Sequence, residues 1–228
     1  MNDSMTVYEA KPFFSNRADA GRRLADKLSQ YRGGDVIILA VPRGGVPVAI
    51  EVARGLDAPL GVVVARKITI PYNPEAGYGA VTEDGTVVLN EPLVRELALP
   101  RHQIERQAKE VQDEIKRRCV VYRRSLPIAQ VKGRTAIVID DGLASGFTML
   151  AAIKSMEREK ASRTVVATPV ASGKAYDLVK PAADNLVCLV IARTYPFAVA
   201  SFYDYWYDLS DEEVMEHLEA WRTECEGR

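Results

Sequence analysis

Short apolar runs alternate along the chain with segments in which apolar residues recur every three or four positions. Continuous apolar runs of strand length are typical of strands buried on both faces of a parallel sheet. We therefore predict an α/β fold with one central parallel sheet of about five strands. The predicted strands are Val36–Val41, Leu60–Ala65, Thr135–Ile139, Thr164–Thr168 and Leu186–Ile191.

Helical periodicity occupies the intervals between these runs, which predicts helices on both faces of the sheet. A capping box, Ser210-Asp-Glu-Glu213, begins a further helix near the C-terminus. The other predicted helices cover roughly Ser15–Tyr31, Val46–Gly55, Arg101–Tyr122, Phe147–Arg158 and Ser172–Lys180.

Two stretches break the alternation. Residues 67–91 are rich in Pro, Gly, Asn and Thr, and the turn sequence Glu83-Asp-Gly85 predicts a hairpin, which we call the flap. Its few large apolar residues predict weak anchoring and a mobile gate. Residues 194–209 hold seven of the 17 aromatic residues. These form either a small satellite core under the C-terminal helix or a wall on which a ligand stacks.

Composition limits the class of protein. The net charge of −1 provides no general field for nucleic acid or a membrane surface, and we expect neither as a partner. The cluster Lys116-Arg-Arg118 with Arg123-Arg124 is expected to be a solvated helix face. The three cysteines lie far apart and predict reduced thiols and no zinc site. Without a signal-like apolar run near Met1, we expect a cytoplasmic protein.

The strongest chemical signal follows the third predicted strand. In Ile137-Val-Ile-Asp140-Asp141-Gly-Leu-Ala-Ser145-Gly-Phe-Thr148, two carboxylates are followed by a loop of small residues that enters a helix. Free N–H groups at a helix N-terminus favour a phosphate, and carboxylates at a strand end suit sugar hydroxyls or magnesium. The alternative is that Asp140 and Asp141 only cap an Asp-Gly turn.

A second loop follows the first predicted strand. In Val41-Pro-Arg43-Gly44-Gly45 the glycines allow close approach of an anion to the backbone, and Arg43 supplies a guanidinium. Taken alone, this is equally well a Gly-Gly loop with a solvated arginine. Two such loops at the ends of two parallel strands favour a functional interpretation of both.

The segment from Ile137 to Met149 resembles the phosphoribosyl-pyrophosphate motif of type I phosphoribosyltransferases, most closely the small, poorly defined bacterial and archaeal members. The resemblance extends from about Val36 to Leu209, since Ala40-Val-Pro-Arg43-Gly44-Gly45 is similar to the family's pyrophosphate loop. It implies a single domain over residues 1–228, with a core at about 15–192, the flap at 67–91, and a hood with the C-terminal helix at 193–226.

The resemblance implies a pentosyltransferase of nucleotide metabolism that moves the 5-phosphoribosyl group from phosphoribosyl pyrophosphate to a nitrogenous base, with Mg²⁺ as cofactor. Asp140 and Asp141 would hold the ribose hydroxyls, directly or through the metal. Lys67, in preference to Arg66, would act on the pyrophosphate. The remaining implied residues are Gly142, Leu143, Ala144, Ser145, Gly146, Phe147 and Thr148 for the 5′-phosphate, and Arg43, Gly44 and Gly45 for the pyrophosphate. Tyr195 and Phe197 directly follow the end of the predicted strand Leu186–Ile191, so we expect one of them to face the base.

Two residues depart from the family pattern. Ala144 stands where 6-oxopurine enzymes carry an acid, and Phe147 stands where a smaller residue or Lys is frequent, so the acceptor base stays open. A homo-oligomer is expected. The alternatives are a non-catalytic regulator on the same fold that binds phosphoribosyl pyrophosphate or a nucleotide, and a phosphatase or sugar-phosphate binder. His102 and His217 receive no chemical role.

Overall fold

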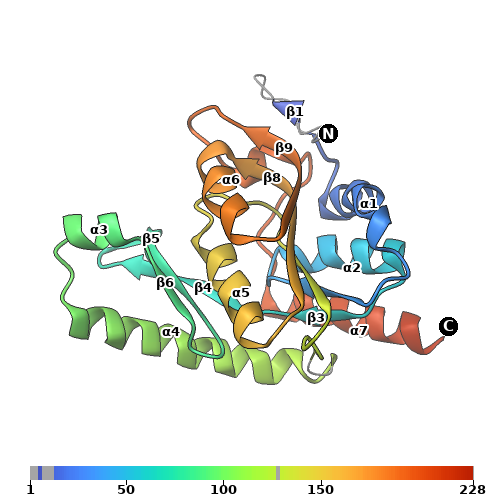
Figure 1. Cartoon of the computed structure of the whole chain (residues 1–228), viewed down its shortest axis with the longest axis horizontal. Helices are drawn as coiled ribbons and strands as arrows, with labels where there is room; N and C mark the ends of the chain where they lie inside the picture. Colours follow the sequence, from blue (N-terminus) through green and yellow to red (C-terminus); the bar gives the residue numbers. More distant parts are fainter. Residues whose placement is uncertain (1–4, 7–12, 127–128, 228) are drawn as a thin grey trace.

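A six-stranded parallel sheet forms the centre of the computed structural model, which describes residues 5–6, 13–126 and 129–227 (Figure 1). The strand order is β1-β9-β8-β7-β2-β3. Each of the five predicted strands has a counterpart in this sheet, one of them shorter than predicted, and the two-residue β1 adds a sixth at the edge, so the predicted fold class is confirmed. The strands are β1 (Met5–Thr6), β2 (Val36–Ala40), β3 (Leu60–Val62), β7 (Thr135–Ile139), β8 (Arg163–Ser172) and β9 (Asn185–Ala192).

Helices cover both faces of the sheet, as predicted. The helices α1 (Arg17–Lys27) and α2 (Gly45–Leu56) pack on one face, and α5 (Phe147–Arg158) and α6 (Gly173–Val179) on the other. The capping box at Ser210 begins α7 (Asp211–Glu226), which packs on α2. Short 3-10 turns occupy Ser29–Tyr31, Lys180–Ala182 and Val199–Phe202. No helix in the described parts of the chain is long and apolar enough to cross a membrane.

The central strands are mostly apolar because both of their faces are buried. In β2, Val36, Ile38 and Ala40 belong to the core under α1 and α2. Ile37 and Leu39 point the other way, into the core under α5 and α6. Successive side chains of a strand point to opposite faces, so a strand between two helical layers has no polar face.

The flap is a separate antiparallel sheet with the order β4-β5-β6. Its strands are β4 (Ala65–Ile70), β5 (Asn73–Thr82) and β6 (Val87–Leu89), followed by α3 (Glu91–Glu96) and α4 (Arg101–Tyr122). The β5–β6 pairing with its turn at 83–85 confirms the predicted hairpin. The single strand predicted for Leu60–Ala65 is wrong, because β3 ends at Val62 and Ala65 begins β4 in the other sheet.

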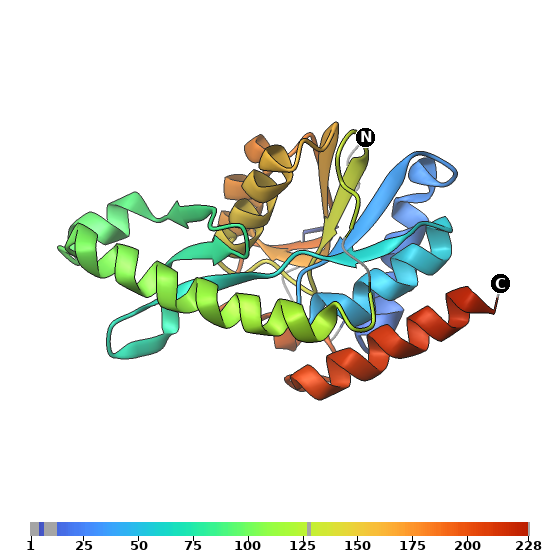
Figure 2. The same ribbon diagram turned by 90° about the horizontal axis from the view of Figure 1, so that it is seen from below.

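The expectation that the flap is weakly anchored is also wrong for its strands. Ile68 and Tyr78 are fully buried against the apolar stripe of α4, and Tyr78 Oη donates a hydrogen bond of 2.9 Å to Gln107 Oε1. Figure 2 shows α4 running along the flap toward α7. Exposure is concentrated at the β4–β5 turn, where the side chain of Tyr72 is fully exposed.

Most aromatic side chains of the hood form a satellite core. Phe14 and Tyr203 are buried there, their ring centroids 5.4 Å apart, and Phe202 and Trp206 pack around them. This cluster lies against β8 and β9 at the start of α1, whereas α7 packs on α2 and α4. The prediction of a satellite core is therefore confirmed, but its predicted place under the C-terminal helix is wrong.

Candidate active site

Two loops meet at the carboxyl ends of neighbouring strands. Strands β2 and β7 pair in parallel with Ala40 opposite Ile139, and Val41 N donates to Ile139 O over 2.8 Å. The segments that follow, 41–45 and 140–146, therefore start side by side. The carboxyl edge of a parallel sheet is where α/β proteins gather their ligands.

The contact between the loops requires glycine at two positions. A Cβ on Gly44 would lie 1.8 Å from Asp141 Oδ2, and a Cβ on Gly45 would lie 2.6 Å from Ile139 O. Neither distance is compatible with a side chain. The glycines thus allow the backbone of the first loop to pass directly against the carboxylates of the second.

The two carboxylates share a site with little solvent. Asp141 N donates to Asp140 Oδ1 over 2.9 Å. Burial, and then the negative charge of Asp141, raise the pKa of Asp140 well above its usual value. Burial also raises the pKa of Asp141, although the neighbouring Arg17 opposes this shift. Binding of a cationic or hydroxyl-bearing group at this pair would lower the free-energy cost of keeping two neighbouring carboxylates charged in a buried site.

Arg17, the first residue of α1, holds Asp141 in place. Its Nε lies 2.8 Å from Asp141 Oδ2, and the two side chains are only 8% and 13% exposed. Its Nη1 donates to Tyr207 O over 2.9 Å, and its guanidinium carbon lies 3.8 Å from the centre of the Trp206 ring. Tyr203 Oη donates to Asp141 O over 2.6 Å. Asp141 is therefore held by one residue near the start of the chain, Arg17, and by one residue of the hood, Tyr203.

Arg17 is not among the site residues expected from the sequence. The available signal was its place on the buried stripe of α1, in line with Ala20, Leu24 and Leu28, which are almost wholly inaccessible. A charged residue on an apolar stripe needs a buried partner. The pattern alone could show that a partner exists, but not that it is Asp141.

The loop between β7 and α5 is tied down on its other side. Leu143 N donates to Val170 O and Ser172 N donates to Leu143 O, each over 2.9 Å, so the loop pairs with the end of β8. Gly146 has φ +85°, a left-handed conformation suited to glycine. Helix α5 starts at the next residue with no side-chain cap, which leaves its first N–H groups available to an anion.

A cavity of about 430 Å³ lies between this loop and the flap. Lys67 of β4 and Ala76, Gly77 and Gly79 of β5 form one side. The opposite side consists of Asp140 together with Gly142, Leu143, Ala144, Ser145, Gly146, Phe147, Thr148 and Met149. The structure thereby brings together Lys67, one acid and every residue predicted for the 5′-phosphate.

Other predicted residues lie outside the cavity lining. Arg43 is half-buried and its charge acts on the hydroxyl of Tyr122, where it opposes the rise in pKa caused by burial. Tyr195 is 96% exposed, and Phe197 packs on Phe202 with ring centroids 5.6 Å apart. Neither ring lines the cavity. The two histidines, His102 and His217, are likewise absent from the lining.

Comparison with known proteins identifies the family. The model of the phosphoribosyl transferase domain matches residues 14–205, which include both loops, the flap and most of the hood aromatics. The chain belongs to this family. The region that matches the phosphoribosyl transferase domain also includes Arg17, and it ends just before Trp206 and Tyr207.

Two curated relatives from Mycobacterium tuberculosis, strains CDC 1551 / Oshkosh and H37Rv, are similar to this phosphoribosyl transferase domain. They are named "Putative phosphoribosyl transferase MT0597" and "Putative phosphoribosyl transferase Rv0571c", and each is 39% identical over 206 residues. The match covers 90% of this chain and 46% of each relative, so the chain spans about half their length. The crystal structure of TT1426 from Thermus thermophilus has a TM-score of 0.76 at 39% identity, covering 91% of this chain and 98% of that chain.

Proposed function

We propose that the chain transfers the 5-phosphoribosyl group of phosphoribosyl pyrophosphate to a nitrogenous base and releases pyrophosphate. The observation that carries this proposal is one cavity that combines a buried carboxylate, an uncapped helix N-terminus and a lysine on a flap. Membership of the phosphoribosyl transferase domain family supports the reaction class.

The reaction exchanges one bond at the ribose C1 carbon for another. The bond from C1 to the pyrophosphate oxygen breaks, and its electron pair leaves with the oxygen. The lone pair of the base nitrogen forms the new C1–N bond, and the proton of that nitrogen is released. After the C1–O bond loosens and before the C1–N bond is complete, the ribose ring carries positive charge. Nearby carboxylates stabilise this charge, which is the role we assign to Asp140 and Asp141.

The 5′-phosphate would bind at the start of α5. The first N–H groups of the helix, with the hydroxyls of Ser145 and Thr148, supply donors for its oxygens. The loop is already fixed to β8 through Leu143, so little ordering is needed when the anion binds.

The pyrophosphate would lie between the first loop and the flap. Lys67 supplies positive charge from β4, and Gly44 and Arg43 approach from the end of β2. Gly45 N already donates to Val41 O over 3.1 Å, so we assign Gly45 to the close approach of the loop and not to anion binding.

Two adjacent carboxylates beside a pyrophosphate fit Mg²⁺, which prefers carboxylate and phosphate oxygens. The described residues contain no group of three or more His, Cys, Asp or Glu placed to hold a metal, so a magnesium ion would arrive with the substrate. When bound, the metal would neutralise charge that develops on the departing pyrophosphate. Asp140 and Asp141 would orient the ribose beside it.

The acceptor is less constrained than the donor. Ala144 is exposed at the cavity and has no polar side-chain atom that could accept a hydrogen bond from a base. We therefore expect an acceptor that is read by the hood or by backbone groups. Tyr195 and Phe197 would contact the base only if the hood shifts toward the cavity.

The test is a screen of nucleobases with phosphoribosyl pyrophosphate and Mg²⁺ that detects pyrophosphate release. We expect release with at least one base, loss of release in Asp140→Asn, and a slower reaction in Lys67→Ala. Lys154→Ala, which removes an exposed lysine from α5, is the matched control and should leave the rate unchanged.

Calorimetry with phosphoribosyl pyrophosphate separates the alternatives. Binding without release for any base would favour a non-catalytic regulator, and no binding would refute the proposed function. Two of the five basic residues that would serve a nucleic-acid partner already have ion-pair partners. Arg118 pairs with Glu114 and Asp211, and Arg123 pairs with Glu83.

A further inference from the structure

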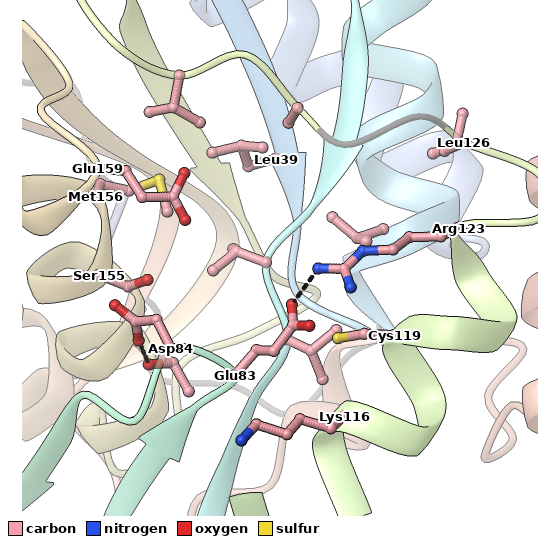
Figure 3. A pocket seen from close by; sticks show the side chains of 16 residues that line it. Leu39, Glu83, Asp84, Lys116, Cys119, Arg123, Leu126, Ser155, Met156 and Glu159 are labelled. Carbon is pink, nitrogen blue, oxygen red and sulfur yellow. Dashed lines mark hydrogen bonds and ion pairs between the residues drawn. The ribbon is translucent and has the colours of Figure 1, made fainter.

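A second cavity of about 320 Å³ lies between the β5–β6 turn, the second half of α4 and the end of α5 (Figure 3). Its described lining shares no residue with the first cavity. This volume would hold about ten water molecules, or one small organic molecule. The apolar part of its wall includes Leu39, Val62, Val64, Val131 and Met156.

Most charged groups around this cavity already have partners. Glu83 Oε2 lies 2.7 Å from Arg123 Nη2. Asp84 accepts hydrogen bonds from Thr86 N and Thr86 Oγ1, at 3.1 and 3.0 Å, and pairs with Arg158. These contacts fix the turn of the flap against α4 and α5.

The thiol in the wall is not a reactive group. Burial, with the nearby Glu83 carboxylate, raises the pKa of Cys119 to about 12, so the thiol stays neutral at ordinary pH. A nucleophilic or metal-binding role for this cysteine is therefore unsupported.

Two polar groups at the end of α5 face the cavity without a partner. Ser155 is only 3% exposed, and its hydroxyl has no hydrogen-bond partner among the described residues. Glu159, one turn further along, is exposed to solvent at the rim and has no ion-pair partner in the described parts of the chain, and Figure 3 shows its carboxylate directed toward the cavity. Burial and the charges of Asp84 and Glu83 raise the pKa of Glu159.

We propose that this second cavity binds a small organic cation with an apolar body. Its ammonium group would donate to the carboxylate of Glu159 and to the hydroxyl of Ser155. Its apolar body would pack on the side chains around Met156 and Val62. Such a ligand would neutralise the one acid of the described cavity lining that has no basic partner.

Other ligand classes fit the wall less well. An anion would face three carboxylates, and the cation nearest to them, Arg123, is already paired with Glu83. Lys116 also lines the cavity, but its side chain is exposed to solvent. A neutral apolar molecule would cover Ser155 and Glu159 without satisfying either, which costs desolvation free energy.

Three probes of similar size and different charge test the proposal: 2-phenylethylamine, 2-phenylethanol and phenylacetate. Titration calorimetry on the full chain should show binding of the amine at low millimolar concentration or tighter. The alcohol should bind at least about fivefold more weakly, because it cannot form a charge-assisted hydrogen bond. Phenylacetate should bind most weakly of the three.

Two variants locate the site. Glu159→Gln should weaken binding of the amine by about fivefold to tenfold, and Ser155→Ala by a smaller factor. Glu157→Gln, two residues away and also exposed, is the matched control and should bind the amine like the unmodified chain.

Three results would each overturn the proposal. They are no binding of the amine at low millimolar concentration, equal affinity for all three probes, and equal affinity of the Glu159→Gln and Glu157→Gln variants. Thermal unfolding of each variant without probe shows whether it is folded. Because none of these residues lines the first cavity, pyrophosphate release provides an independent readout of the proposed function.

Discussion

Replacing Arg17 with methionine should destabilise the fold, because it leaves the buried carboxylate of Asp141 without its charged partner. The substitution keeps much of the aliphatic stem but removes the ion pair with Asp141, in which both side chains are almost wholly buried. Loss of one partner of a buried pair costs about 3–5 kcal/mol. Two unit charges about 4 Å apart interact by about 4 kcal/mol at an effective dielectric constant of about 20, which agrees with that range.

Part of the loss should depend on pH. Burial already raises the pKa of Asp141, and without Arg17 it should rise further. A carboxyl group whose folded pKa lies above its unfolded value favours the folded state only while it is protonated, so its contribution is lost as pH rises through the folded pKa. The difference between Arg17→Met and the unmodified chain should therefore be small near about pH 4 and largest near about pH 8.

Another part should not depend on pH. The hydrogen bond from Arg17 to Tyr207 O and the contact with the Trp206 ring are lost at every pH, at a cost of about 1–2 kcal/mol. Urea unfolding at several pH values measures both parts. The difference in unfolding free energy between Arg17→Met and the unmodified chain then has a plateau at low pH, which is the pH-independent part. Its increase at higher pH is the part due to Asp141.

Arg23→Met is the matched control on the same helix. Arg23 pairs with Asp19 over 2.9 Å, but its side chain is 52% exposed, so its removal should cost no more than about 1 kcal/mol. If Arg17→Met destabilises no more than Arg23→Met, or if its effect is the same at every pH, the assignment of Arg17 as the group that holds Asp141 is wrong.

Three further predictions concern the site and the hood. Asp140→Asn should stabilise the fold near neutral pH, because burial and Asp141 disfavour the charged form, yet it should weaken phosphoribosyl pyrophosphate binding by about 10-fold or more in calorimetry. Gly44→Ala should displace the Asp141 carboxylate and greatly reduce pyrophosphate release; unchanged activity would contradict the 1.8 Å contact. Phe197→Ala should lower the thermal midpoint, since the ring packs on Phe202, and a loss of base affinity without a change in midpoint would favour a stacking role.

The sheet was predictable because its signal is local. The central strands are buried on both sides and are therefore mostly apolar, and Val36–Ala40 is apolar at every position. The end of the predicted second strand was not predictable, because Val63 and Val64 are as apolar as their neighbours and nothing in the sequence marks the passage into the flap sheet.

The candidate site was predictable where its residues are contiguous in the sequence, and not where its supports come from distant segments. The loop after β7 combines small residues, acids and a helix start in one contiguous segment, so its chemistry can be read directly. The supports of Asp141 come from residues 17, 203 and 207, which only tertiary structure brings together. The prediction that the flap is weakly anchored failed for the same reason, because α4 supplies the anchoring hydrogen bonds from 29 residues away along the chain.

The pairing of residues 13–15 with 202–205 has a consequence for the order in which the site forms. Asp204 N donates to Phe14 O over 2.8 Å and Tyr205 N donates to Ser15 O over 3.0 Å, so the start of α1 is fixed only after the hood segment arrives. During synthesis, β7 and its two acids emerge more than 60 residues before Tyr203. A nascent chain at that stage would carry the complete loop between β7 and α5 without the contact that aligns α1 beside it. The alignment of α1 beside the two acids should therefore follow the synthesis of the hood segment.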